Sequence, residues 1–385
     1  MRELLDYRDD FPILAETTYL INHSLGAMPA EAERRLLAYA ETWKTRGVRA
    51  WGEGWWDMPL TVGDRIARLI GAAPGSVGMH QNVTVAVAVV LSCFDFRGER
   101  RRIVYVEGEF PSVRYLLQAQ RNAEVVVVPD QEALLEALDE RALLVPVSHV
   151  LFRTAEIQDV ATIAARAHDV GAHVVLDAYQ SVGTVPLDVS ALGVDFAAGG
   201  SVKWLCGGPG AAWLYVRPDL AERLEPTLVG WQAHERPFAF EPDLEYAGGV
   251  ARFLTGTPNV PALHAASAGY DVIAEVGVDR IRANSLRQTE LLIALLDEAG
   301  FEVTSPREPA RRGGTVTVLA PAFEALHREL AERSILCDFR PGVGLRLGPH
   351  FFTSDDELRL AVDAMSEVVR TKGHERGVAA GAARY

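Results

Sequence analysis

Short apolar runs alternate with helix-like stretches over the first two thirds of the chain. Four runs are rich in β-branched residues and contain few polar positions, at residues 102–108, 124–130, 142–150 and 173–179. Such runs are typical of strands that are buried on both faces of a parallel sheet. Apolar residues recur at helical spacing in the stretches between them, at residues 113–122, 132–140 and 159–171. This order predicts a doubly wound α/β layer with a mostly parallel sheet.

The later part of the chain has a different pattern. The stretch 241–259 is rich in turn-forming residues and indicates a domain junction. A long helical region follows at 261–300, and short strands and helices continue to about residue 369. We therefore expect a large domain and a smaller C-terminal α/β domain, with an N-terminal segment on the small domain and a disordered tail. The expected bounds of the segment, the two domains and the tail are 1–15, 16–254, 255–370 and 371–385.

Composition excludes several classes of protein. The net charge of −14 argues against a nucleic-acid partner, because phosphate binding needs a basic surface. No apolar run is long enough to span a membrane, and the N-terminus has no apolar block of the kind found in signal peptides. The three cysteines lie far apart and lack metal-ligand spacing, so we expect reduced thiols, a cytoplasmic location and no metal site.

Lysine is rare in this chain. The 38 basic residues include only three lysines, at positions 44, 203 and 372. Lys203 lies among glycines and apolar residues in GGSVKWLCGGPG, between two strand-like runs at 194–200 and 211–218. A primary amine in this setting suggests imine formation, which a guanidinium does not perform. From composition alone, a lysine that occurs at this position by chance is supported as well as a catalytic lysine is.

An acid and this lysine are expected at one edge of the sheet. Asp177 ends the strand-like run HVVLD, and Lys203 follows 26 residues later after one more such run. Ligands of open α/β sheets bind at the carboxyl ends of strands, so both side chains can reach one crevice. An acid there can keep the pyridine nitrogen of a cofactor protonated, which makes the ring a better electron sink. A lone Asp at this position would more often be a cap or a turn residue.

Other candidate ligands carry weaker signals. Asn82, Val83 and Thr84 open a helix-like run, where backbone N–H groups bind phosphate, although a simple helix cap has the same pattern. Thr257 lies in a turn, and its hydroxyl is either a phosphate ligand or turn chemistry. Phe110 and Trp231 could each lie on a cofactor ring or be an ordinary core aromatic. Arg346 could bind a substrate carboxylate or be an ordinary ion-pair residue.

The segment DAYQSVGTVPLDVSALGVDFAAGGSVKWLCGGPGAAWLYV resembles the cofactor core of class V aminotransferases, which are fold type I pyridoxal 5′-phosphate (PLP) enzymes. The resemblance extends over nearly the whole chain and is strongest to kynureninase. The supporting segments are TTYLINHSLGAMP, residues 43–48, EGEFPSVRY, SHVLFRTAEIQD, VGWQAHE and ILCDFRPGVGLRLGPH. The family fold has a large domain with a mostly parallel, seven-stranded sheet and a smaller C-terminal α/β domain.

The resemblance implies a role for each matching residue. Lys203 would form a Schiff base with PLP and then remove the α-proton of an amino-acid substrate, and Asp177 would pair with the pyridine nitrogen. Val83 and Thr84 would hold the phosphate, and Phe110 would stack on the ring. The remaining roles are cofactor contact by Ser148 and Gln180, phosphate contact across a homodimer interface by Trp231 and Thr257, and substrate binding by Arg346 and Trp51.

Several positions depart from the kynureninase pattern. Gln180 replaces a His, Val202 a Tyr, Val113 an Asp, Thr257 an Asn and Trp51 a His. The Tyr handles protons, and the His and Asn residues contact the aromatic substrate. The implied activity is hydrolytic Cβ–Cγ cleavage of L-kynurenine to anthranilate and L-alanine. The alternatives are a class V aminotransferase and a sulfur amino-acid lyase or desulfurase. A PLP-fold sensor is disfavoured because no basic DNA-binding extension is present.

Overall fold

The computed structural model describes residues 2–320 and 323–371. The predicted apolar runs form a seven-stranded sheet in the order β2-β8-β7-β6-β5-β3-β4. Strands β3 to β7 run parallel to one another, whereas β8 pairs antiparallel with β7 and β2 antiparallel with β8. The bounds are β2 Val77–His80, β3 Arg102–Val106, β4 Glu124–Val128, β5 Ala142–Ser148, β6 His173–Asp177, β7 Phe196–Gly200 and β8 Ala212–Val216. The mostly parallel α/β layer is confirmed.

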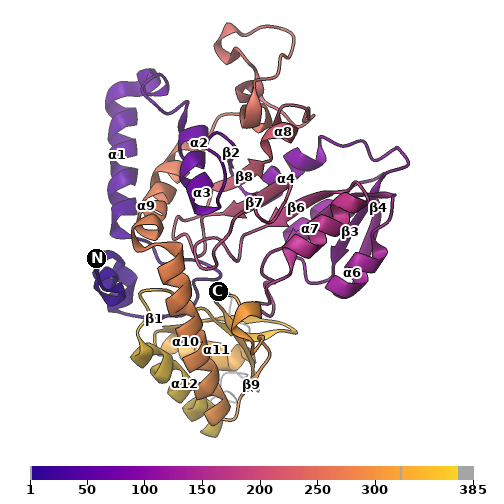
Figure 1. The fold of residues 1–385 in the computed structure, drawn as a ribbon. Coiled ribbons are helices and arrows are strands. Elements are labelled where there is room, and N and C mark those ends of the chain that lie inside the picture. Colours follow the sequence, from indigo (N-terminus) through magenta and orange to yellow (C-terminus); the bar gives the residue numbers. More distant parts are fainter. Residues whose placement is uncertain (1, 321–322, 372–385) are drawn as a thin grey trace.

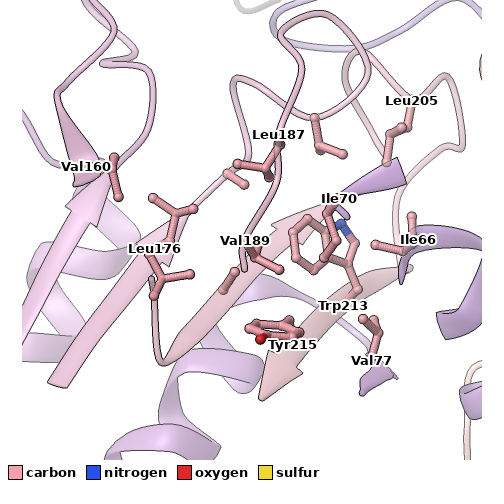
Figure 2. Close-up of a cluster of buried hydrophobic side chains, with 14 of the residues drawn as sticks. Ile66, Ile70, Val77, Val160, Leu176, Leu187, Val189, Leu205, Trp213 and Tyr215 are labelled. Atoms are coloured by element: carbon pink, nitrogen blue, oxygen red, sulfur yellow. The ribbon is translucent and has the colours of Figure 1, made fainter. Parts of the chain in front are cut away.

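Both faces of this sheet are apolar, which explains why its strands read as nearly continuous hydrophobic runs. Leu176 of β6 belongs to one core with Trp213 and Tyr215 of β8, whereas Val175 and Leu214 belong to a second core on the opposite face. Figure 2 shows the first of these cores, in which Ile66, Ile70 and Val77 also pack near Trp213. Successive side chains on a strand point to opposite faces, so each strand supplies both cores.

The helices that accompany this sheet begin where the sequence patterns predict. They include α4 Val83–Leu91, α5 Pro111–Gln118, α6 Gln131–Ala137 and α7 Val160–Asp169. The short helix α8 Pro218–Ala221, which begins at the end of the expected strand-like run 211–218, was not predicted. Earlier in the chain lie α1 Ala30–Arg46, η3 Gly47–Trp51, α2 Met58–Thr61 and α3 Gly63–Leu69. The long connection after α8 carries only short turns of 3₁₀ helix, η4 Trp231–Ala233, η5 Pro237–Ala239 and η6 Gly249–Phe253. The part of this connection around η5 projects from the top of the molecule in Figure 1.

The predicted helical region at 261–300 is two helices rather than one. Helix α9 spans Val260–Val276 and α10 spans Val278–Glu298, and they meet at Gly277, whose φ of 86° ends the first helix. Helix α9 lies beside α1, whereas α10 continues towards the C-terminal elements (Figure 1). The division of the chain at residue 254 stays a prediction.

The C-terminal elements form a separate antiparallel sheet in the order β12-β13-β10-β9, with its own apolar core. The elements of this part of the chain are β9 Glu302–Val303, η7 Pro309–Arg311, β10 Val316–Leu319, α11 Phe323–Glu332, β11 Ile335–Leu336, β12 Asp338–Arg340, β13 Gly344–Leu347 and α12 Asp355–Arg370. Helices α10, α11 and α12 pack together around this sheet (Figure 1). A smaller C-terminal α/β unit is therefore present, as predicted.

The N-terminal segment lies against α12 and the turn before it. Its elements are η1 Leu4–Asp10, η2 Pro12–Ala15 and β1 Thr18–Tyr19, and β1 pairs parallel with β11. Arg8 of η1 bonds to the Glu357 carboxylate at 2.6 Å and to the Phe352 carbonyl at 2.7 Å. The predicted tail from residue 372 lies outside the described residues. Among the described helices, none is long and apolar enough to cross a lipid bilayer.

Candidate active site

The carboxyl ends of three neighbouring strands converge on one cavity of about 200 Å³. Ser148 ends β5 and lies opposite Asp177, which ends β6, and Lys203 follows the end of β7 by three residues. The sequence-predicted pair of Asp177 and Lys203 therefore shares one crevice. The lining residues are Asn82, Val83, Thr84, Phe110, Ser112, Val113, Ser148, Val150, Phe152, Asp177, Tyr179, Gln180 and Lys203.

The Lys203 amine is suited to act as a nucleophile or a base near neutral pH. Burial lowers the pKa of Lys203 to about 7, an effect that Asp177 opposes and that the charges of Arg346 and Arg340 reinforce. The Nζ atom lies 4.3 Å from the ring centre of Tyr179 and 5.4 Å from that of Phe110. A substantial fraction of the amine is therefore neutral at pH 7, and it faces aromatic surface.

Asp177 is placed to hold a cationic group. Burial raises the pKa of Asp177 above its usual value, whereas the backbone N–H of Tyr179, 2.8 Å from Oδ1, and the Lys203 amine act in the opposite direction. A protonated pyridine nitrogen in the cavity would favour the ionised carboxylate in the same way as the Lys203 charge does.

The start of α4 supplies an anion site on the cavity wall. Asn82 caps this nine-residue helix, and its Oδ1 accepts a hydrogen bond from the Val85 N–H at 3.0 Å. Val83 and Thr84 follow and line the cavity. N–H groups at a helix start bind phosphate well, so these residues fit the phosphate of PLP.

Gln180 and Phe110 form further parts of the wall. The Gln180 amide is held in place, because its Nε2 donates to the His23 carbonyl at 3.1 Å and its Oε1 accepts from the Trp204 indole at 3.2 Å. Phe110 packs edge to face against Phe152, with ring centres 5.2 Å apart. The cavity thus combines a reactive amine, a buried acid, an anion site and aromatic surface, which together fit PLP.

Arg346 lies beside the cavity but is absent from the described lining. Its Nε donates to Oδ1 of Asp338 at 2.8 Å, and its Nη1 donates to the carbonyl of Phe152 at 2.7 Å. Its charge contributes to the lowered pKa of Lys203. The predicted contact between Arg346 and a substrate carboxylate stays a prediction.

Trp51, Trp231 and Thr257 do not line the described cavity of their own chain. Trp231 packs against Trp56 with ring centres 4.6 Å apart, and Trp51 packs against Trp55 at 5.6 Å. We call the group formed by Trp51, Trp55, Trp56, Trp231, Phe238 and Phe240 the aromatic cluster. Thr257 is exposed in the turn before α9. The resemblance places Trp231 and Thr257 across a homodimer interface and gives Trp51 a substrate-binding role, and all three roles stay predictions.

Sequence reasoning missed a buried acid at this site. Glu109 is only 1% exposed, and burial raises its pKa to about 7, with a further increase from Asp177. It precedes Phe110 and follows β3, so it belongs to the same edge of the sheet as Asp177. An acid shortly after a buried strand was the available signal, as it was for Asp177.

Comparisons with known proteins identify the family of this chain. A family model of class V aminotransferases matches residues 43–370. The chain is 33% identical to a kynureninase of Pseudomonas fluorescens and 30% identical to one of Burkholderia pseudomallei, in each case over 96% of this chain and 93% of the relative.

Solved structures share the fold. The apo cysteine desulfurase of Thermococcus onnurineus NA1 matches with a TM-score of 0.84 at 22% identity, over 96% of this chain and 99% of that chain. The cystine C-S lyase C-DES, in complex with its product cysteine persulfide, matches with a TM-score of 0.83 at 23% identity, over 93% and 99%. From the family match and the identity to these relatives, the chain belongs to the class V aminotransferase family of PLP-dependent enzymes.

Proposed function

We propose that this protein is a kynureninase-type hydrolase, which uses PLP and water to cleave the Cβ–Cγ bond of L-kynurenine into anthranilate and L-alanine. The observation that carries the proposal is the Asp177–Lys203 pair in one cavity, in a chain that is 33% identical to a kynureninase along almost its whole length. Two departures from the kynureninase pattern bear on this proposal. Gln180 replaces a His that contacts the substrate, and Val202 replaces a Tyr that handles protons.

The cofactor would be held by residues of three elements. The N–H groups at the start of α4 would bind its phosphate, Phe110 would cover its ring, and Asp177 would hold its pyridine nitrogen. When bound, PLP withdraws electrons from the α-carbon of an amino acid. That chemistry acts equally on an aminotransferase, a lyase or a hydrolase substrate, so the protein residues decide the reaction.

The chain's own groups then move the protons and bind the substrate. The Lys203 amine, with a pKa of about 7, can take a proton from the substrate α-carbon and return it near neutral pH. We assign binding of the substrate carboxylate to Arg346, whose positive charge also helps to lower the pKa of Lys203. Phe110, Phe152 and Val150 give the cavity apolar walls that suit an aromatic substrate side chain.

The second candidate is an aminotransferase or a sulfur amino-acid lyase, which Gln180 and the GTP turn at Thr257 favour. A desulfurase that uses a cysteine nucleophile is disfavoured by the thiols. Burial raises the pKa of Cys93, Cys206 and Cys337 to about 12 in each case. All three are free thiols, which supports a reducing, cytoplasmic compartment as our proposal for location.

We also propose a homodimer whose subunits share active sites. The aromatic cluster supports it, because Phe240 is 75% exposed and Phe238 is 55% exposed in the single chain. Exposed aromatic surface of this kind marks interfaces. In the dimer, Trp231 and Thr257 would approach the partner's cavity.

The test of the activity is incubation of the PLP-loaded protein with L-kynurenine. We expect equal amounts of anthranilate and alanine, and no product from Lys203→Ala. Sulfide from cysteine, or an oxo acid formed together with the pyridoxamine form of the cofactor, without anthranilate, would instead establish the second candidate.

A further inference from the structure

Tyr179 presents an aromatic face to the lysine that is not assigned any role above. The residue directly follows Asp177 and Ala178, and its backbone N–H holds Oδ1 of Asp177 at 2.8 Å. Its side chain lines the cavity, and its ring centre lies 4.3 Å from the Lys203 Nζ. The backbone of one residue therefore fixes the acid while its ring faces the amine.

Gly200 determines where this ring can lie. A Cβ atom on Gly200, at the end of β7, would lie 2.5 Å from both Cζ and the hydroxyl oxygen of Tyr179. The absence of a side chain at Gly200 thus lets the phenol lie across the end of the neighbouring strand. Burial raises the pKa of the Tyr179 phenol to about 12, so it stays neutral in the working range of the enzyme.

Phe110 presents the second aromatic face. Its ring centre lies 5.4 Å from Nζ, it comes from the start of α5 rather than from β6, and it packs edge to face against Phe152. Phe110 and Tyr179 thus come from different elements, and both line the cavity within 5.4 Å of the same amine.

We propose that Tyr179 is a second stacking residue, which binds the PLP ring on the face opposite Phe110. The inference rests on the proposed attachment of PLP to Lys203, because a planar ring joined to Nζ enters the space that these two rings border. The negative π-face of a phenol favours an electron-poor, protonated pyridine. Tyr179 is thereby a cofactor-binding residue that contributes affinity, while Asp177 sets the charge of the same ring.

The test compares PLP affinity in four proteins: wild type, Tyr179→Ala, Tyr179→Phe and Gly200→Ala. The dissociation constant is measured by equilibrium dialysis of the holoenzymes, with bound PLP read from its absorbance and from quenching of protein fluorescence. We expect Tyr179→Ala to bind about tenfold more weakly and Tyr179→Phe to bind within about twofold of wild type. Gly200→Ala should also weaken binding, because it displaces an unaltered Tyr179.

Thermal unfolding without PLP identifies variants that are misfolded, and Gly200→Ala keeps the inference testable if Tyr179→Ala is one of them. Equal affinity in folded Tyr179→Ala and wild type would reject the stacking role and leave the proposed function intact. Equal weakening by Tyr179→Phe and Tyr179→Ala would also reject it, because the hydroxyl rather than the ring would then be responsible. Failure of the wild type to bind PLP would reject both proposals.

Discussion

The Glu109 carboxylate accepts two hydrogen bonds from Ser148, one from its backbone N–H at 2.8 Å and one from its hydroxyl at 2.5 Å. Ser148 in turn lies opposite Asp177 in the register of β5 and β6, and its carbonyl accepts from the Gln158 side chain at 2.6 Å. A second buried acid, Glu109, thus holds the end of β5 beside Asp177. Because its hydroxyl proton is directed at Glu109, Ser148 presents an acceptor oxygen to the cavity.

Glu109→Gln should change how stability depends on pH. The unfolded chain releases this proton near pH 4.5, whereas burial raises the pKa of Glu109 in the folded chain to about 7. Between these values the folded state binds the extra proton, so stability falls as pH rises. The interval corresponds to about 3 kcal/mol in the free energy of unfolding, which the variant lacks.

Urea unfolding of the cofactor-free protein between pH 4.5 and 7.5 measures this difference. The stability of wild type minus that of the variant should fall by about 3 kcal/mol across the range. Glu107 follows the same strand and is exposed, so Glu107→Gln provides a control for the loss of a carboxylate from this region. Parallel curves for wild type and Glu109→Gln would show that Glu109 is ionised in the folded protein.

The lowered pKa of Lys203 predicts how fast the cofactor attaches. Burial and the nearby arginines lower this pKa to about 7, and only the neutral amine attacks an aldehyde. The rate of attachment of PLP to cofactor-free protein should therefore rise from pH 6 to 8 and level off above that, instead of rising up to pH 10.

Stopped-flow absorbance measures this rate, with Lys203→Ala as the control for attachment to the other two lysines. A rate that keeps rising tenfold per pH unit up to pH 10 would show that the amine has the pKa of an ordinary exposed lysine.

Part of this site could be predicted because it follows from the topology of a parallel sheet. The apolar runs 142–150 and 173–179 form the parallel neighbours β5 and β6, so their carboxyl ends, at Ser148 and Asp177, meet at one edge. Glu109 was missed although it shares the signal of Asp177, because an acid after a strand is usually exposed and only the tertiary packing encloses this one. The break at Gly277 was missed because apolar periodicity continues on both sides of it.

Arg346 shows a different limit of sequence reasoning. Its candidate role came from the resemblance, but its partner comes from strand register: Asp338 and Arg346 lie directly opposite each other on β12 and β13. The hairpin sequence CDFRPGVGLRL contains this pairing, although the register depends on the turn between the strands. Trp231 could not be placed from one chain, because its proposed surroundings include a second subunit.

Asp338→Asn should destabilise the protein strongly. The Asp338 side chain is completely buried, and it pairs with Arg346 at 2.7 Å and with Arg340 at 2.9 Å. Burial opposes ionisation, but His23, Arg346 and Arg340 outweigh it and lower the pKa of Asp338 to about 2. Loss of the negative charge leaves the buried Arg346 uncompensated, at a cost of about 3 kcal/mol or more.

Chemical denaturation at pH 7 checks this cost. Asp297→Asn is the matched control, because Asp297 pairs with Arg307 in an exposed bridge whose side chains are 44% and 57% exposed. Its loss should cost less than about 1 kcal/mol. Similar losses in the two variants would mean that the Asp338 pair is far more hydrated than its burial indicates.

Replacement of exposed aromatic residues should dissociate the proposed dimer. Phe238 and Phe240 are the most exposed members of the aromatic cluster, and both contact Trp231. Phe238→Ser combined with Phe240→Ser removes apolar area that a partner subunit would cover, so the dimer should dissociate at higher protein concentration. Because Trp231 and Thr257 would act across the interface, PLP affinity should fall together with dimer content.

Analytical ultracentrifugation over a range of concentrations gives the dimer dissociation constant, and PLP absorbance gives the occupancy of the same samples. Tyr115→Ser is the control, because Tyr115 is 69% exposed on α5, outside the aromatic cluster. A wild-type protein that remains monomeric at micromolar concentration while it binds PLP fully would show that one chain completes its own site. In that case the exposed rings of Phe238 and Phe240 must serve a purpose other than self-association.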